Sequence, residues 1–514
     1  MPEQPEQPKN FTLENLKEAV RSAAALRLQV RLHGAGGDGD KVFPPTYAGG
    51  VYAVEDRRIA GKVVRCAVID SVQSQANRME EALLDAFLPA WRELDPKAAP
   101  SCDLPVLALH IDGHGWVNSL TAPHRVHDAI LRDSEIGEER TTNGETEKVK
   151  VRFRESAIGQ RIVAARLHDA AALYEHCPTV LIFGTWDSTA GEGLDSAKIP
   201  RAVVSEIVGV DITPGVRTAS RIDPLGIRAQ SATVYRLKDR EDDWTLEESE
   251  AAKNGKGEAK KFGKGKPSDI NHGNVTPDMP RFDGQEIRKQ NLDKLPDLLE
   301  TTPLELRYKF SSGDGRIDGQ GSFRSDEVRI RPGAVKPGGI TMDHALHTWT
   351  LSFTQLRRLR FPMPSAGSQN EAGAASAATS DATGASQTPP TQEQRDEPAR
   401  TVLAALALYA LALQQERGYW LRSRCELVPS EPIVLLRVGA SGGSYSLGSS
   451  TDVRTMLLDP ALAEAERLGV RWSKTVTILE PIEKLKELVR RSDARGPELE
   501  PEPGEEPADA GAAS

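Results

Sequence analysis

Residues 63–87 read VVRCAVIDSVQSQANRMEEALLDAF, which predicts a strand followed directly by a helix. The apolar run 63–69 predicts a strand suited to the centre of a sheet. Ser71 is a favoured N-cap residue, and a helix is predicted from it through about Leu94. One side of that helix is apolar (Val72, Ala76, Met79, Leu83 and Phe87), and the other carries Gln73, Gln75, Asn77, Arg78 and Glu81. A strand that passes directly into an amphipathic helix indicates a mixed α/β or α+β fold.

Further elements are predicted on both sides of this unit. Helical spacing of apolar residues predicts helices over 13–32 and 161–174, and a buried helix, apolar nearly all round, over 401–415. Strands are predicted at 51–54, 106–111, 179–183, 203–212, 304–310, 328–330, 421–427 and 433–438, the last two as a hairpin. Helices and strands interleave, so the chain is predicted to be α+β or α/β with irregular insertions.

Four segments are predicted to lie outside the packed core. They are the N-terminus 1–10, the loop 253–266 with six lysines and four glycines, the Ala/Ser/Thr/Gly/Gln-rich linker 365–399, and the acidic tail 491–514. Such compositions favour flexible or disordered chain. The domain prediction is therefore a core over 11–364 with insertions, completed by a helix and a hairpin over 400–490.

The net charge of -10 over 514 residues comes from two of these segments. Residues 365–399 carry a net charge of -4 and residues 496–514 carry -6, so the rest of the chain is balanced. Basic patches can therefore exist without a global negative field, and a nucleic-acid partner is not excluded.

The four cysteines and the apolar runs exclude several classes of protein. Cys66, Cys102, Cys177 and Cys425 are far apart in the sequence, which excludes a Cys-rich zinc motif and argues against a disulfide framework. The longest strongly apolar run, 402–413, is short of the roughly 20 residues of a membrane helix. The N-terminus has no basic-then-apolar signal. A soluble cytoplasmic protein without membrane association is expected.

The strongest metal-like cluster is a group of histidines and acids within 110–128: His110, Asp112, His114, His124, His127 and Asp128. Such residues can surround zinc or a harder cation, but their spacing completes no metal fingerprint. Solvated histidines at a strand end and loop are the favoured interpretation. No metal or cofactor is therefore predicted.

Catalytic motifs are equally weak. The sequence has no GxSxG, GxxxxGK[ST] or GxGxxG pattern. The glycine-rich stretch 33–40, HGAGGDGD, lacks a following Lys-Ser/Thr and predicts a turn. Asp70 could be a general base or a metal ligand, although an Asp at this position more often caps the following helix.

Several segments suit contact with a phosphodiester backbone. The lysine loop would release counterions on meeting phosphates, and LRRLRF at 356–361 groups three arginines that can hold phosphates or stack on bases. The amide-rich face of the 71–94 helix and the HGN turn at 272–274 offer donors without sequence choice. Each also has an ordinary structural explanation, as a solvated loop, surface helix or turn.

Taken together, the segments resemble a CRISPR-associated RAMP protein, the backbone subunit of the type I-U (I-G) Cascade interference complex. The segments that carry the resemblance are FPPTY (43–47), DSVQSQANR (70–78), FGTWDS (183–188), RAVVSEIVG (201–209), SRIDPL (220–225), HGNV (272–275), LRRLRFP (356–362) and LRSRCELV (421–428). The resemblance covers residues from about 11 to 490, and the lysine loop, linker and tail look like additions.

The resemblance implies an α+β, ferredoxin-like, RRM-related core (palm) with fingers and thumb insertions. It also implies a non-catalytic subunit whose copies line up along one guide RNA (crRNA) in the cytoplasm, with other Cascade subunits, for antiviral defence. Target DNA would be reached through pairing with the guide. Such a protein grips sugar and phosphate and leaves sequence to base pairing. Repeated head-to-tail contacts that do not close make an open helical filament.

The predicted RNA-binding residues are polar and basic side chains of the matching segments and of the lysine loop. They are Ser71, Gln73, Gln75, Asn77, Arg78, Arg221, Lys256, Lys260, Lys261, Lys264, His272, Asn274, Arg357, Arg358 and Arg360. The alternative is a RAMP-type endoribonuclease that processes guide precursor or cuts target RNA, with Asp70 or the histidine group in catalysis. A plain interaction protein with an incidental basic loop is the third hypothesis.

Overall fold

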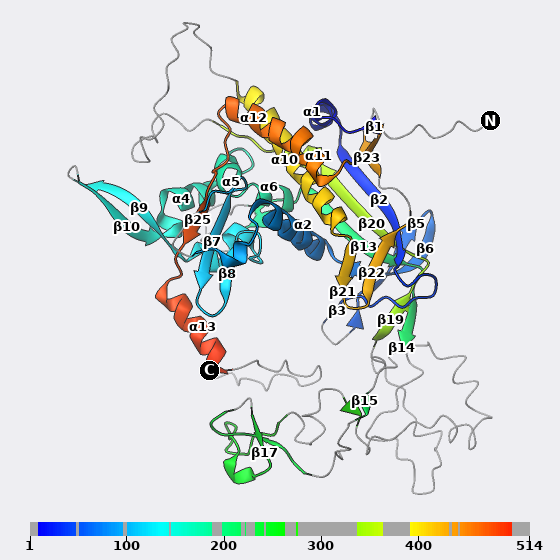
Figure 1. Ribbon diagram of the computed structural model, residues 1–514, viewed down its shortest axis with the longest axis vertical. Helices are drawn as coiled ribbons and strands as arrows, with labels where there is room; N and C mark the ends of the chain where they lie inside the picture. The colour runs from blue at the N-terminus through cyan, green and yellow to red at the C-terminus, as the bar shows by residue number, and fades with distance from the viewer. Residues whose placement is uncertain are drawn as a thin grey trace, which may run out of the picture. The chain divides into compact units, whose positions relative to one another are not determined.

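The computed structural model divides into two compact units (Figure 1). Unit 1 comprises residues 1–40, 54–211 and 342–488, and unit 2 comprises residues 41–53, 212–341 and 489–514. The structure describes residues 9–47, 51–95, 100–142, 145–187, 198–216, 221–222, 232–240, 243–262, 274–275, 337–362, 391–430, 434–439 and 443–495.

The main sheet belongs to unit 1 and, among the described residues, has ten strands. Its path runs β1 (Lys9–Asn10), β24 (Gly443–Ser446), β23 (Val434–Val438), β2 (Ala25–Gly34), β20 (His344–Ser352), β13 (Val203–Val210), β6 (Lys62–Asp70) and β5 (Val54–Ile59). The hairpin β21 (Tyr419–Arg422) and β22 (Cys425–Pro429) joins this sheet at β2. From β23 to β5 all neighbouring strands are antiparallel.

Helices cover one face of this sheet. On β2, buried Leu26, Leu28, Val30 and Leu32 alternate with exposed Arg27, Gln29, Arg31 and His33, which is the pattern of a strand buried on one side. Helices α2 (Val72–Phe87) and α10 (Gln392–Glu416) contact each other, and both lie along the buried side (Figure 1). The face of Arg27 and Arg31 is the polar face of the sheet.

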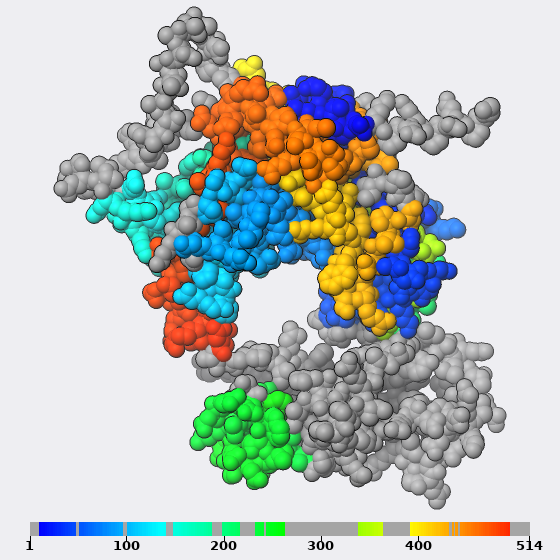
Figure 2. Space-filling model, in the orientation of Figure 1, coloured from blue at the N-terminus to red at the C-terminus, as the bar shows by residue number. Residues whose placement is uncertain are grey.

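Helix α10 forms the centre of the helical layer, with nearly every residue from Arg395 to Ala412 buried. It packs on α1 (Leu13–Ser22), α2, α11 (Ser450–Val453) and α12 (Asp459–Arg467). In Figure 2 the orange segment that holds α12 lies against dark-blue α1, where the Lys17 ammonium is 2.7 Å from a Glu464 carboxylate oxygen. Such surroundings explain a helix that is apolar on all sides.

The remaining described elements of unit 1 flank this layer. A small sheet contains β7 (Val106–Ile111), β8 (Gly115–Asn118) and β25 (Val476–Leu479), and two-stranded pairs are β9 (Glu135–Thr142) with β10 (Glu145–Arg152) and β11 (Thr185–Trp186) with β12 (Lys198–Ile199). The other helices here are α3 (Ala129–Arg132), α4 (Ala157–Ala164), α5 (Ala171–His176), α6 (Thr179–Phe183), α9 (Phe353–Leu356) and the single turns Trp91–Glu93, Arg125–His127, Phe153–Glu155 and Arg454–Leu458. Helix α13 (Glu483–Arg495) ends the described chain.

Unit 2 contains short strand pairs. They are β3 (Thr46–Tyr47) with β4 (Val51–Tyr52), β14 (Thr213–Val216) with β19 (Pro337–Thr341), β15 (Arg221–Ile222) with β18 (Asn274–Val275), and β16 (Tyr235–Arg236) with β17 (Trp244–Thr245), beside the turn Glu248–Glu250. The predicted strands at 304–310 and 328–330 lie outside the described residues.

The α+β prediction is confirmed, and so are the strands over 63–69 and 106–111 and the buried helix over 401–415, while the strand predicted over 203–212 ends at Val210. The single helix over 13–32 is wrong, because α1 ends at Ser22 and the alternating residues that follow form β2. The strand at 179–183 is wrong too, since these five buried residues form α6.

Four other boundaries are corrected. The 71–94 helix ends at Phe87, and two helices, α4 and α5, replace the single helix over 161–174. Residues 392–399, assigned to the linker, are the start of α10. Residues 421–427 do not form one strand paired with 433–438: the hairpin turns between β21 and β22, and β23 pairs with β2 and β24.

Within the described ranges, no helix combines the length and the apolar character needed to cross a bilayer.

Candidate nucleic-acid interface

The Asp70 carboxylate, fully buried where β6 meets α2, accepts hydrogen bonds on both oxygens. Its donors are Ser74 Oγ at 2.9 Å, Gln75 Nε2 at 2.7 Å, Arg78 Nε at 2.9 Å and Arg422 Nη2 at 3.0 Å. The backbone cap of α2 is Ser71, whose side chain accepts from the Ser74 N–H. The prediction that Asp70 caps the helix is therefore wrong, and its carboxylate instead forms ion pairs with two guanidinium groups.

These contacts fasten the β21–β22 hairpin to the β6–α2 junction. Arg422 also donates to the Ile69 carbonyl at 2.7 Å, and Arg78 donates to the Leu421 carbonyl at 2.7 Å. The motifs DSVQSQANR and LRSRCELV, separated by more than 340 residues, therefore meet at one carboxylate. Removing the carboxylate would release both the hairpin and the end of β6.

A second set of buried hydrogen bonds reaches the same hairpin from the sheet. Gln75 Oε1 accepts from Ser205 Oγ at 2.9 Å, and Ser205 Oγ lies 2.9 Å from His347 Nε2. His347 Nδ1 lies 3.1 Å from the hydroxyl of Tyr419 on β21. The hairpin is therefore held at Tyr419 as well as at Arg422, which makes it a rigid extension of the sheet.

The polar face of the sheet presents a surface suited to a polyanion. Arg27 is paired with Thr350 and Gln29 with Thr348 in the β2–β20 register, so guanidinium, amide and hydroxyl groups share this face. Within the described part of the chain, neither Arg27 nor Arg31 has a hydrogen bond or ion pair through its side chain. The acid of β13, Glu206, lies 2.7 and 3.1 Å from the Arg57 guanidinium, which it shares with Glu55.

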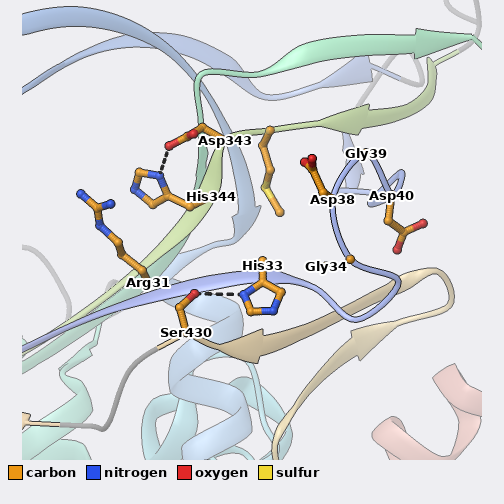
Figure 3. Close-up of a pocket in the computed structure, with 11 residues that line it drawn as sticks. Arg31, His33, Gly34, Asp38, Gly39, Asp40, Asp343, His344 and Ser430 are labelled. Atoms are coloured by element: carbon orange, nitrogen blue, oxygen red, sulfur yellow. Dashed lines mark hydrogen bonds and ion pairs between the residues drawn. The ribbon is translucent and has the colours of Figure 1, made fainter.

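A pocket of about 420 Å³ lies at the end of this face, where β2 passes into the 33–40 turn (Figure 3). His33 Nδ1 is 2.9 Å from Ser430 Oγ, and His344 Nδ1 is 2.7 Å from Asp343 Oδ2. Arg31 and His33 line this pocket together with Asp38, Asp40 and Asp343, so cationic and acidic side chains meet at this end of the face, while Arg27 lies further along β2. The turn predicted at 33–40 is confirmed, with Gly37 and Gly39 at φ 89° and 77°.

The predicted residues of the 71–94 helix divide into two groups. Gln73 and Asn77 are exposed, and Ser71 is half-buried at the cap. Gln75 is fully buried and Arg78 is bound to Asp70, so both hold the fold together. The prediction that the polar helix face includes Gln75 is wrong.

The arginines of LRRLRF are engaged within the fold to different degrees. Arg357 donates to the carbonyls of Val20 and Ala23, both at 2.8 Å, and Arg360 lies 3.1 Å from Asp396. Arg358 is exposed and bonds Gln355 at 3.3 Å. Of the three, Arg358 is the most accessible to an external phosphate.

The described part of the lysine loop, residues 253–262, is folded. Lys253 bridges Ala259, and the Phe262 N–H donates to the Val234 carbonyl at 2.9 Å, so these residues form a small β structure beside β16. Flexibility is therefore the wrong description for them. Lys256 and Lys261 are exposed and Lys260 is half-buried. Arg221 pairs with Asn274 in the β15–β18 register, while Lys264 and His272 lie outside the described residues.

The histidine group does not assemble. Among the described residues, no cluster of three His, Cys, Asp or Glu side chains is arranged to hold a metal ion. His127 is buried with Nδ1 2.8 Å from Thr185 Oγ1, and burial lowers the pKa of its imidazole to about 4. Asp128 caps α3. The four cysteines are free and buried.

Sequence reasoning missed Arg27, Gln29 and Arg31. The signal was present, because Leu26, Leu28, Val30 and Leu32 alternate with polar residues, and period-two alternation marks a half-exposed strand. Assigning 13–32 to one helix concealed it.

Part of the chain matches a known protein family. Residues 26–214 match the family model described as CRISPR-associated protein GSU0053 (Cas_GSU0053). The matched region runs from β2 through β13 and includes the Asp70 junction. No curated protein matches the chain. The family match supports a CRISPR-associated protein and is consistent with a role in CRISPR defence.

Proposed function

We propose that this protein is a non-catalytic, guide-RNA-binding backbone subunit of a type I-U (I-G) CRISPR interference complex. The observation that carries the proposal is the polar face of the main sheet. It presents Arg27, Gln29 and Arg31 beside the threonines of β20, with both guanidinium groups available to phosphates. Because backbone contacts carry no sequence information, this surface suits any guide.

The strand order supports a ferredoxin-like core for this subunit. In chain order, β2, α2, β13, β20, α10 and β23 form a βαββαβ series, and the strands lie in the order β23-β2-β20-β13. This is the split βαβ arrangement of that fold, with the β5–β6 hairpin added beside β13. Sheets of this kind leave one face open, and RRM proteins bind RNA there.

The partners follow from the same proposal. Several copies would contact one another head to tail along one guide, with other Cascade subunits at the ends and target DNA reached by pairing with the guide. Co-purification of RNA of uniform length with the chain would support such an assembly. A monomer free of nucleic acid after expression with a guide array would contradict it.

The main test replaces Arg27 and Arg31 with alanine. Each substitution should weaken binding of single-stranded RNA about tenfold at moderate salt, because each removes a charge-assisted hydrogen bond. The slope of log affinity against log salt should fall by about 0.7 per arginine. Fluorescence anisotropy over a salt series measures both quantities.

The matched control is Arg92→Ala, an exposed arginine paired with Glu81 at 3.2 Å on another part of unit 1. Its affinity and salt slope should equal those of the unsubstituted protein. If the Arg27 and Arg31 variants had the same salt slope as the control, this face would not be part of the RNA-binding site.

The lysine loop gives a weaker prediction. Lys256→Ala combined with Lys261→Ala should reduce the salt slope and lower RNA affinity several-fold, because exposed lysines act as point charges on phosphates. Substitution is preferable to deletion, since residues 253–262 form part of a folded structure. An unchanged slope, with an unchanged unfolding midpoint, would exclude these lysines from RNA binding.

A further inference from the structure

Trp420 is the most exposed tryptophan among the described residues, with 64% of its surface accessible. It lies on β21, paired with Glu426 of β22, and the Glu426 carbonyl accepts a hydrogen bond from the Ala35 N–H at 3.0 Å. Its neighbour Tyr419 points to the buried side and meets His347. Because neighbouring strand residues face opposite ways, Trp420 lies on the polar face of the sheet.

The register connects Trp420 to the cationic residues of that face. Val428 of β22 pairs with His33 of β2, and Arg31 follows two residues along the same side. Trp420 is level with Ala35, so Arg31 lies two strand spacings across, roughly 10 Å, and four residues back along β2, roughly 13 Å. A chain of nucleotides lying across β21, β22 and β2 would therefore meet an indole first and guanidinium groups next.

The surroundings of Trp420 favour a nucleobase over a protein partner. The cores of protein interfaces are continuous apolar patches, whereas the neighbours of this indole on the face are Glu426, half-buried Val428 and His33. Single-stranded nucleic acids bind where aromatic rings alternate with cations. Contacts at Arg422 and Tyr419 hold the hairpin still, so little entropy is lost when a base stacks.

We propose that Trp420 is a base-stacking residue for the single-stranded guide, and that the β21–β22 hairpin positions it. This inference rests on the proposed function and adds a contact of a different kind, to a base instead of a phosphate. Asp70, which ties the hairpin to α2, is then a positioning residue for the stack.

The experiment compares Trp420→Ala, Trp420→Leu and Trp420→Phe on a single-stranded RNA of mixed sequence. Trp420→Ala should lower affinity roughly 5- to 150-fold, while the salt slope stays unchanged because no phosphate contact is lost. Trp420→Phe should recover most of the affinity and Trp420→Leu little of it. Trp244→Ala, which removes another exposed tryptophan (44%), is the control and should bind normally.

An abasic oligomer of the same length separates stacking from every other role. It carries the same phosphates without bases, so the Trp420→Ala variant and the unsubstituted protein should bind it equally. Equal loss on both ligands, or a change in self-association without a change in RNA affinity, would overturn the inference. If the unsubstituted protein bound no RNA, the proposed function itself would fail, and the stacking role with it.

Discussion

Asp70→Ala is expected to lower the free energy of unfolding by about 3 kcal/mol, because it leaves two guanidinium groups and a buried amide without their acceptor. Arg78 and Arg422 are 29% and 26% exposed, so water can recover part of the loss. Urea unfolding followed by tryptophan fluorescence measures the change. An unfolding midpoint equal to that of the unsubstituted protein would contradict the anchoring role.

Two variants sharpen this prediction. Glu81→Ala, which removes an exposed carboxylate of α2 paired with Arg92 of the following turn, should change stability by less than about 1 kcal/mol. The double variant Asp70→Ala/Arg422→Ala should cost less than the two single changes together, because the unpaired guanidinium is gone. A strictly additive cycle would show that the two side chains are not coupled.

The same contacts decide how the ribonuclease alternative can be tested. Loss of RNA cleavage in Asp70→Ala would not identify a general base, since the substitution disturbs the hairpin as well. Exposed His114 is the better probe among the alternative's candidates. Metal-dependent cleavage abolished by His114→Ala, at unchanged stability, would favour the ribonuclease over the proposed binding subunit.

The success of the sequence prediction depended on how distinct each pattern was. The run 63–69 and the following capped helix carry strong local signals, and both elements form. Within residues 13–32, Leu28 fits the apolar stripe of a helix that begins at Leu13. It also fits the alternation of apolar and polar residues in a strand, so the two patterns overlap at this residue. For TVLIF at 179–183, a short apolar run does not distinguish a buried strand from a buried helix turn.

The site was less predictable than the fold. The polarity of Gln75 suggested an exposed amide, but besides the nearby Asp70 its partners are Ser205 and Gln414, which come from distant segments. Long-range pairing of this kind leaves no periodic trace in a single sequence. DSVQSQANR was rightly singled out as a motif, although two of its predicted RNA-binding residues, Gln75 and Arg78, hold the fold together.

Acid is expected to destabilise the protein through His347, which is fully buried between β13 and the hairpin. Burial lowers the pKa of its imidazole from 6.5 to about 4. The unfolded chain therefore takes up a proton between these values and the folded chain does not, so stability falls as pH falls from about 6.5 towards 4. The loss from this one residue is about 2 kcal/mol at pH 5 and about 3 kcal/mol at pH 4.

The hydrogen bonds of His347 also predict that the folded state is less stable in acid. The Ser205 hydroxyl donates to Gln75, so it accepts from His347 Nε2–H, and His347 Nδ1 then accepts from the Tyr419 hydroxyl. If Nδ1 took up a proton, it could no longer accept the hydrogen bond from the Tyr419 hydroxyl, and the two side chains would have to rearrange. Because Tyr419 precedes Trp420, the hairpin should loosen together with this contact.

The measurement is urea unfolding at pH 7.5 and pH 5 for the unsubstituted protein and His347→Gln. The glutamine is neutral at both values, so its stability should depend on pH by about 2 kcal/mol less. His127 and His176, whose pKa values burial also lowers, remain in both proteins and cancel in the comparison. Identical pH dependence of stability in the two proteins would mean that His347 accepts a proton in the folded state. The buried hydrogen bonds that run from Asp70 to Tyr419 would then differ from those in the structure.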